Sequence, residues 1–264
     1  MIIKRIINKI KTIYKKRAIE AEYQRENKKD LALKTNYHPE LNQAIDAFKK
    51  NGGIFNYFAL AESAVRSFFY QLYLLEKDEY SLIELGGGQS TLFLNSICEA
   101  SHINLYSYEH DPDYVKYLKT KVTSNKVIVN YTPLKQISAD VRAEIFANPK
   151  EAIDIFIKKA QDVSPDEFKN TRLVNGFYTV LKEQFPNKEI DGIIVDGPHG
   201  NGRSLAFSIF YKYMKPGLLV LMDDFDHYPF LDDLSKLCKY TILEKRKYKT
   251  SIKAWVVLRI EKVL

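Results

Sequence analysis

The stretch Ser81-Leu-Ile-Glu-Leu-Gly-Gly-Gly-Gln-Ser-Thr91 determines how this chain of 264 residues is organised. Its first half is a short apolar run typical of a buried strand, and three consecutive glycines follow before a helical pattern begins. Glycine permits positive φ and close approach to a ligand, while the first turn of a helix offers free N–H donors. The stretch therefore predicts a strand, a ligand-binding turn and a helix.

The same alternation of strand and helix continues to residue 264. Short runs rich in Val, Ile and Leu alternate with helical patterns, which indicates a parallel sheet covered on both faces. We expect strands at 82–85, 104–108, 126–130, 192–195, 218–222, 241–244 and 254–260. The last two are joined by the lysine-rich Lys245–Lys249, which suits a hairpin at one sheet edge. The expected fold class is α/β, with a doubly wound, mostly parallel seven-stranded sheet.

Two further segments flank or interrupt this pattern. Pro39–Glu76 predicts two helices broken at Asn51-Gly52-Gly53. Residues 132–189 exceed an ordinary crossover between strands and show helical periodicity in Ala139–Ala160 and Pro165–Phe185. We interpret residues 132–189 as a helical insertion that either shapes a substrate pocket or serves only for packing.

The N-terminus predicts an amphipathic helix with a basic polar face. Apolar residues recur there at three- and four-residue steps. Residues 1–34 are thus expected to form a helical arm and a polar linker, and residues 35–264 the main domain. The apolar stripe of residues 1–17 either contacts an anionic membrane surface, packs on its own domain or on a second copy in a homodimer, or belongs to a cleaved targeting segment.

Charge and cysteine content limit the partners and the compartment. The formal charge of +7 equals the excess carried by residues 1–17, so the remaining chain is balanced and does not suggest a nucleic-acid groove. Cys98 and Cys238 have no metal-ligand spacing and are expected to be buried thiols. No apolar run approaches the length of a membrane span. These features predict a cytoplasmic protein without a nucleic-acid partner, with membrane association through the arm as an alternative.

Two glutamates sharpen the interpretation of the glycine turn. Glu84 lies two residues before the first glycine, and Glu109 ends the next expected strand. A carboxylate at that second strand end can accept both ribose hydroxyl protons of a bound nucleoside. A glycine turn alone would also suit a nicotinamide enzyme, but Thr91 stands where the third glycine of that motif would be.

Glu84-Leu-Gly-Gly-Gly-Gln-Ser-Thr91, followed by Tyr106-Ser-Tyr-Glu-His-Asp111, resembles the first two cofactor motifs of class I S-adenosylmethionine-dependent methyltransferases. The resemblance covers roughly residues 82–264 and implies the sheet order 3-2-1-4-5-7-6. It further implies that Glu84 helps to hold the amino group of the cofactor, that Glu109 binds its ribose, and that Asn130 and Tyr131 lie at its adenine edge. Gly86, Gly87 and Gly88 would flank its methionine portion.

The fourth and fifth strands are followed by further polar residues. Asp196-Gly-Pro-His-Gly-Asn-Gly-Arg203 follows the fourth strand, and Asp223-Asp224 ends the fifth. Asp196, Asp223 and Asp224 offer hard oxygen ligands for Mg²⁺. This pattern is similar to metal-dependent sugar O-methyltransferases, whereas the Asp-Gly-Pro turn more closely resembles polysaccharide-directed methyltransferases, so metal-assisted and metal-free chemistry both stay open.

The expected reaction is methyl transfer to an oxygen acceptor. Asp196 or His199 would act as general base, and Arg203 would hold an anionic substrate, hold the Asp196 carboxylate or cap the following helix. Aromatic residues near the active edge would form a platform for a ring: Tyr57, Phe58, Phe225, Tyr228 and Phe230. A sugar or polysaccharide hydroxyl is the preferred acceptor. The alternatives are a small phenolic metabolite, or a non-catalytic scaffold that has kept the fold.

Overall fold

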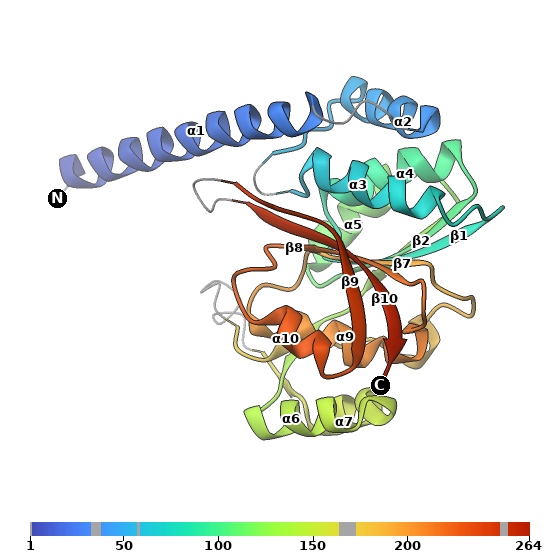
Figure 1. The fold of residues 1–264 in the computed structure, drawn as a ribbon. Helices are drawn as coiled ribbons and strands as arrows, with labels where there is room; N and C mark the ends of the chain where they lie inside the picture. Colours follow the sequence, from blue (N-terminus) through green and yellow to red (C-terminus); the bar gives the residue numbers. More distant parts are fainter. Residues whose placement is uncertain (1, 33–37, 57–58, 164–172, 249–252) are drawn as a thin grey trace.

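A central sheet with helices on both faces forms the body of the molecule in the computed structural model (Figure 1). The structure describes residues 2–32, 38–56, 59–163, 173–248 and 253–264, with the side chains of the first helix described from residue 12 to residue 31. Within these ranges, no helix has the length and apolar character needed to pass through a bilayer.

The main sheet contains seven strands in the order β3-β2-β1-β7-β8-β10-β9. Its strands are β1 (Tyr80–Leu85), β2 (Ile103–Glu109), β3 (Val127–Tyr131), β7 (Gly192–Val195), β8 (Leu219–Asp223), β9 (Cys238–Lys247) and β10 (Ala254–Val263). β3, β2, β1, β7 and β8 run parallel, while β10 pairs antiparallel with both β8 and β9. The predicted fold class, strand order and terminal hairpin are therefore confirmed.

Helices cover the two faces of the sheet as separate layers (Figure 1). On one face lie α2 (Pro39–Lys50), α3 (Glu62–Tyr73), α4 (Gln89–Ala100) and α5 (Pro112–Lys121). On the other face lie α9 (Leu205–Ile209) and α10 (Phe230–Ser235), with the short turns η3 (Asn201–Ser204) and η4 (Tyr211–Tyr213).

Each face of the sheet has its own apolar core, because successive residues of a strand point to opposite sides. Leu82 of β1 packs with the α2–α4 layer, while the next residue, Ile83, packs with the α9 layer. All six residues of β1 are buried, as expected for a central parallel strand. Cys98 and Cys238 are buried free thiols, as predicted.

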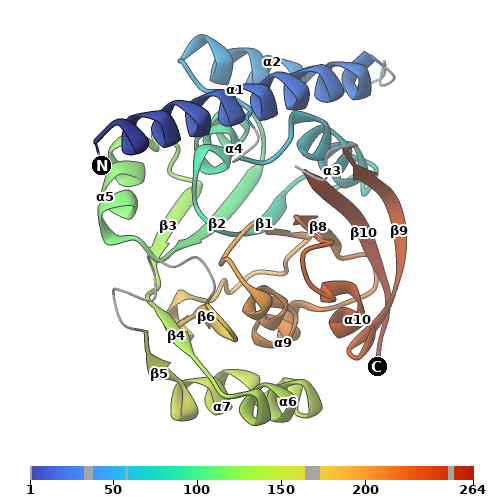
Figure 2. The same cartoon turned by 90° about the vertical axis from the view of Figure 1, so that its left-hand side faces the viewer.

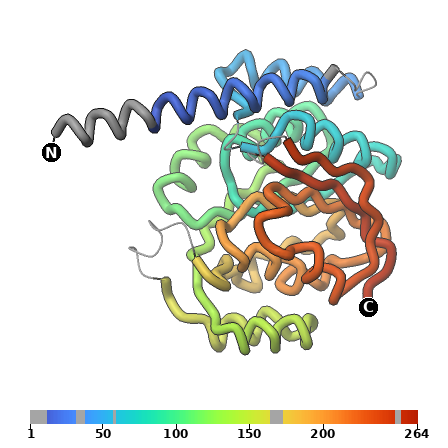
Figure 3. The backbone as a smooth tube through the Cα atoms, turned by 60° about the vertical axis from the view of Figure 1, so that its left-hand side comes forward, coloured from blue at the N-terminus to red at the C-terminus, as the bar shows by residue number. Residues whose placement is uncertain are grey.

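The N-terminal arm differs from the prediction. α1 is one helix over Ile2–Ala32, so the described part of the expected polar linker is helical. Tyr23 is fully buried against Tyr248, with ring centroids 5.9 Å apart, and Asn27 Oδ1 accepts a hydrogen bond from the Ser63 amide. Figure 3 follows α1 across the layer of α2 and α3. The second half of α1 is thus part of the main domain, since Tyr23 and Asn27 are buried against it.

The insertion also departs from the all-helical expectation. α6 (Ala139–Ala147), η1 (Pro149–Glu151) and α7 (Ala152–Lys159) confirm the first helical segment, with a break at Asn148-Pro149 where proline cannot continue a helix. A three-stranded sheet accompanies them, formed by β4 (Leu134–Gln136), β5 (Gln161–Asp162) and β6 (Gly176–Tyr178) in the order β5-β4-β6 (Figure 2).

The second predicted helix of the insertion, Pro165–Phe185, is wrong for the residues that the structure describes. Residues 173–185 contain β6 and the short turn η2 (Lys182–Gln184). β6 pairs antiparallel with β4, and a Cβ built on Gly176 would lie 1.9 Å from Leu173 Cδ2. Pairing and close packing therefore override the helical pattern, while residues 164–172 lie outside the described ranges.

Candidate active site

The glycine turn after β1 meets the turn after β7 at the carboxyl edge of the sheet. Gly86 has φ +95°, and a Cβ built on it would lie 2.7 Å from the Gly197 nitrogen. The amides of Asp196 and Gly197 donate to the Leu85 carbonyl, at 2.9 and 2.7 Å. Only glycine at position 86 allows both this conformation and this approach.

The neighbouring glycines have different roles. A Cβ on Gly87 would lie 3.0 Å from Ser107 Oγ and 3.1 Å from Glu109 Cβ, so this position packs tightly against β2. Gly88 precedes α4, and a Cβ on it would meet nothing closer than 3.8 Å. The open space beside Gly88 leaves room for a ligand at the N-terminus of α4.

Glu84 lies beneath this turn and is fully buried. Its Oε2 accepts hydrogen bonds from Thr91 Oγ1 and Ser107 Oγ, both at 2.6 Å, whereas its Oε1 has no hydrogen-bond partner in the described part of the chain. Burial raises the pKa of Glu84 to about 7, although the hydroxyls of Ser107, Thr91 and Ser90 act to lower it. A buried oxygen without a donor is unfavourable, and a ligand cation would satisfy it.

Glu109 ends β2 and is almost fully buried. Its Oε1 accepts a hydrogen bond from the Asp111 amide at 2.8 Å, which fixes the carboxylate at the start of α5. Asp111 caps that helix by accepting from the amides of Asp113 and Tyr114, at 2.9 and 3.0 Å. A capped helix start therefore holds Glu109 in place.

The glycine turn and Glu109 line one cleft of about 300 Å³, whereas Glu84 is buried beneath the turn and is not part of the lining. The cleft is lined by Gly86–Ser90, Glu109, His110, Tyr114, Tyr178, Asp196–His199, Asn56 and Ala59. Asp196 and His199, predicted as catalytic, thus share a cleft with the glycine turn and Glu109. Burial at the cleft wall and the Arg203 guanidinium lower the pKa of His199, so its imidazole is neutral at pH 7 and able to accept a proton.

A lysine, Lys253, lies near all three predicted metal ligands, Asp196, Asp223 and Asp224. Asp223 is fully buried, and Lys253 Nζ donates to its Oδ2. Burial alone would lower the pKa of Lys253, but the carboxylates of Asp223, Asp196 and Asp224 outweigh it and raise the pKa. Among the described residues, no group of three or more His, Cys, Asp or Glu side chains is placed to hold a metal ion. A lysine, which the sequence prediction missed, supplies the cation that the aspartates require.

Arg203 has a structural position instead of facing a substrate. It is 3% exposed, its Nε donates to the Pro198 carbonyl at 3.0 Å, and its Nη1 donates to the Asp223 carbonyl at 2.7 Å. Its guanidinium also lies 5.9 Å from the centre of the Phe230 ring. Arg203 therefore ties the turn after β7 to the end of β8, which is why it is buried.

Other predicted ligand residues lie outside the cleft lining. Phe225 packs against the apolar core and Tyr228 packs on Phe230, while Tyr57 and Phe58 fall outside the described residues. Asn130 and Tyr131 end β3 without lining the cleft; Tyr131 is exposed, and Gln184 Nε2 of the insertion donates to its carbonyl at 3.1 Å.

The cleft wall contains residues that sequence reasoning did not select. Tyr178 comes from the insertion, and Asn56 and Ala59 come from the segment before α3. His110 and Tyr114 follow Glu109 directly, so their position beside a predicted ligand residue was the one available signal. Nothing in the sequence pattern placed Tyr178 there, because the pairing of β6 with β4 is a tertiary feature.

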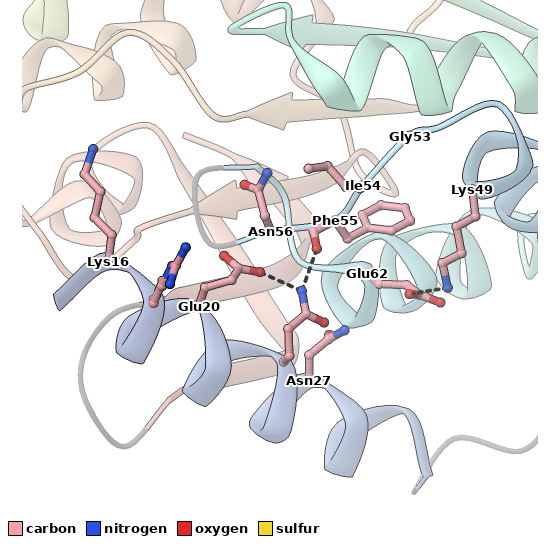
Figure 4. Close-up of a pocket in the computed structure, with 11 residues that line it drawn as sticks. Lys16, Glu20, Asn27, Lys49, Gly53, Ile54, Phe55, Asn56 and Glu62 are labelled. Atoms are coloured by element: carbon pink, nitrogen blue, oxygen red, sulfur yellow. Dashed lines mark hydrogen bonds and ion pairs between the residues drawn. The ribbon is translucent and has the colours of Figure 1, made fainter. Parts of the chain in front are cut away.

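A second, larger hollow of about 660 Å³ lies between α1 and residues 53–56 (Figure 4). Lys16, Glu20 and Asn27 of α1 line one side, and Phe55 and Asn56 line the other. Gln24 Nε2 links Glu20 Oε1 to the Phe55 carbonyl, at 2.7 and 3.0 Å. Because Asn56 lines both spaces, this hollow adjoins the cleft.

No protein-family model and no curated protein matches the chain. A tRNA methyltransferase from M. jannaschii is similar in structure, with TM-score 0.40 and 11% identity over 77% of this chain and 51% of that one, so this chain spans about half its length. A precorrin-6Y C5,15-methyltransferase from Geobacter metallireducens has TM-score 0.42 and 11% identity over 76% and 89% of the two chains.

A variant of MtNAS in complex with S-adenosylmethionine has TM-score 0.36 and 9% identity over 84% of this chain and 73% of that one. None of these three TM-scores reaches 0.5, so the likenesses carry no functional argument. The function has to be inferred from the cleft itself.

Proposed function

We propose that this protein is an S-adenosylmethionine-dependent methyltransferase. The observation that carries the proposal is one cleft that combines an open glycine turn, the carboxylate of Glu109 and, beneath the turn, an unpartnered oxygen of the buried Glu84. This combination suits a ligand with an ammonium group at one end and ribose hydroxyls at the other.

The residues present fit that cofactor. Glu84 Oε1 would accept a hydrogen bond from its amino group, and Glu109 would accept the ribose hydroxyl protons. The N-terminus of α4, with open space at Gly88, favours its carboxylate. When bound, the cofactor supplies an electrophilic methyl group on a sulfonium sulfur.

The chemistry left to the protein is positioning and proton acceptance. An acceptor hydroxyl must lose its proton as its oxygen is methylated, and a base in the cleft wall can accept that proton. His199 is neutral at pH 7 because its pKa is lowered, and Asp196 lies in the same wall. We assign His199 as the base, with Asp196 as the alternative.

The proposed acceptor is a hydroxyl of a sugar or polysaccharide. The hollow beside the cleft supports this choice, because amides, carboxylates and the cations of Lys16, Arg17 and Lys49 line it together with Phe55, and such groups can bind several hydroxyls. A small phenolic metabolite is the second candidate, and a scaffold without activity the third.

A transfer assay with methyl-labelled S-adenosylmethionine tests the proposal. We expect label in a sugar or polysaccharide fraction, and His199→Gln should lower the rate by about 10²–10⁴-fold. The wild-type rate should fall as pH drops below the lowered pKa of His199, where the imidazole becomes charged. Cofactor binding without transfer to any acceptor would favour the scaffold.

We also propose that α1 contacts an anionic membrane surface through its first half. Ile13 and Tyr14 are 44% and 68% exposed, so neither packs on the domain. Deleting residues 1–15, which keeps Lys16 and Arg17 in the lining of the hollow, should abolish binding to anionic vesicles and leave turnover of a soluble acceptor intact. If the deletion disrupted a dimer and did not affect vesicle binding, the helix would be assigned to contact with a second copy of the chain.

A further inference from the structure

The hydroxyl of Tyr178 is a buried donor without a partner. Tyr178 ends β6, is 1% exposed, and its Oη makes no hydrogen bond to a described residue. Its ring is held by register with Leu134 of β4 and by an edge contact with Phe177, whose ring centroid is 5.3 Å away. A fixed, unsatisfied donor in the wall of a cleft is unfavourable until something accepts from it.

The hydroxyl lies where the two cleft turns meet. A Cβ built on Gly197 would lie 2.3 Å from Tyr178 Oη and 2.9 Å from Gly86 Cα. Any side chain at position 197 would therefore displace the phenol. The glycine of the Asp196-Gly-Pro198 turn makes room for a tyrosine that comes from the insertion.

Tyr178 belongs to the Glu109 end of the cleft. Its ring centroid is 6.2 Å from that of His110, and Tyr114 lines the same cleft. Burial raises the pKa of Tyr178 well above its ordinary value, and among charged groups the Glu109 carboxylate contributes most to that rise. The phenol therefore stays protonated at pH 7 and has a proton to donate.

We propose that Tyr178 is a positioning residue that donates its hydrogen bond to the nucleoside half of the ligand in the cleft. With His110 and Tyr114 it forms the aromatic wall of that half, a role that the sequence assigned to Asn130 and Tyr131. The inference rests on the proposed function, because it takes S-adenosylmethionine as the ligand. The opposite end, with Glu84 and the α4 N-terminus, is left for the amino-acid half.

Two ligands distinguish the two halves. S-adenosylhomocysteine and methylthioadenosine share the thioadenosine group, but only the first has an amino-acid end. Tyr178→Phe removes the hydroxyl and keeps the ring, so calorimetry should show both ligands weakened by the same factor, about 3–10-fold. The thermal midpoint of the free protein should not fall, because the lost hydroxyl has no partner to lose.

Tyr108→Phe is the matched control. Tyr108 is also buried, but its hydroxyl donates to the Gln184 carbonyl at 2.7 Å, and the residue does not line the cleft. This variant should bind both ligands like the wild type and melt at a lower temperature.

Three results would overturn the assignment, and they are distinguishable. Loss confined to S-adenosylhomocysteine would place the hydroxyl at the amino-acid half. Unchanged affinity for both ligands would leave Tyr178 without a ligand role. A wild-type protein that binds neither ligand would overturn the proposed function itself, whereas the first two results leave it standing.

Discussion

Carboxylates lie at the same sheet edge on four strands, β1, β2, β7 and β8. These carboxylates differ in the groups that balance their charge. Glu84 keeps an oxygen without a partner beneath the cleft, and Glu109 lines it. Asp223 also has an oxygen, Oδ1, without a hydrogen-bond partner among the described residues, but its charge is balanced by the buried Lys253, and its backbone carbonyl accepts from Arg203. Within the described residues, no lysine or arginine pairs with Glu84 or Glu109, whereas Lys253 pairs with Asp223.

This difference argues that a buried carboxylate near a strand end indicates a functional site when no protein cation balances its charge. A carboxylate whose charge is already balanced by a buried lysine holds the structure together. The cofactor half of the cleft is therefore open to a cation, and the aspartate cluster behind it already contains one. Each prediction below tests one side of this contrast.

The largest expected effect is on stability, from Lys253→Met. Removing the ammonium leaves the buried Asp223 carboxylate unpaired, which should lower the free energy of unfolding by about 3–5 kcal/mol in denaturant titrations. Lys247→Met is the control, because Lys247 pairs with Asp226 but is 55% exposed, and it should cost about 0–1 kcal/mol.

The double variant Lys253→Met/Asp223→Leu sharpens this test, because it removes both charges and should recover most of the lost stability. If Lys253→Met alone lowered the free energy of unfolding by less than about 1 kcal/mol, Lys253 and Asp223 would not form a buried ion pair. The contrast between Asp223 and the cleft glutamates would then fail.

Among the cleft glutamates, Glu109→Ala removes the proposed hydrogen-bond acceptor for the ribose hydroxyls. Affinity for S-adenosylmethionine should fall by about 1.5–3 kcal/mol in calorimetry, as for hydrogen bonds to a charged group. Glu261→Ala, an exposed glutamate on β10 outside the cleft, should leave affinity unchanged. A folded Glu109→Ala variant with full affinity would remove Glu109 from the site.

A smaller effect is expected from pH, through Glu84. Its pKa of about 7 is raised from the ordinary 4.5, so it is protonated in the folded protein at pH values where the unfolded chain is ionised. Stability of the free protein should therefore fall as pH rises from about 4.5 through 7. Glu84→Gln should remove this part of the pH dependence.

Ligand binding should show the opposite trend, because an ammonium prefers the ionised carboxylate. Affinity for S-adenosylhomocysteine should rise between about pH 5.5 and 7.5, by at most about tenfold per pH unit, while the ligand amino group stays protonated. Methylthioadenosine lacks the ammonium group of the amino-acid end, so its affinity should be independent of Glu84. Equal pH dependence for both ligands would contradict the ammonium contact.

The smallest expected effect is that of chelation. Because Lys253 already balances Asp223, transfer activity should be unchanged in excess EDTA. Loss of activity that Mg²⁺ restores would show that Asp196 and Asp224 bind a metal ion despite the lysine. The aspartates would then be part of the active site.

Local patterns were sufficient for much of the fold and for the floor of the cleft. Residues 82–85 form a strand because all of them except Glu84 are apolar, and Gly86 has positive φ, as its place in a strand-to-helix turn predicts. Glu109 was located because it follows the next apolar run. These features depend on neighbours in sequence, so their position could be predicted without tertiary contacts.

The missed features depend on contacts between distant residues. Lys253 pairs with Asp223, and β6 brings Tyr178 beside Gly197 through its pairing with β4. The polar surface of residues 20–32 predicted a linker, although Tyr23 and Asn27 bury against α3 and the terminal hairpin. A helical pattern cannot reveal which of its faces will find a partner.

The most direct test of the central claim is isothermal calorimetry at pH 7.5. The wild-type protein is titrated with S-adenosylmethionine and, separately, with NAD. The account predicts binding of one S-adenosylmethionine per chain, strongly weakened in Glu109→Ala, and no heat with NAD. Binding of NAD without binding of S-adenosylmethionine would contradict it and assign the glycine turn to a dinucleotide.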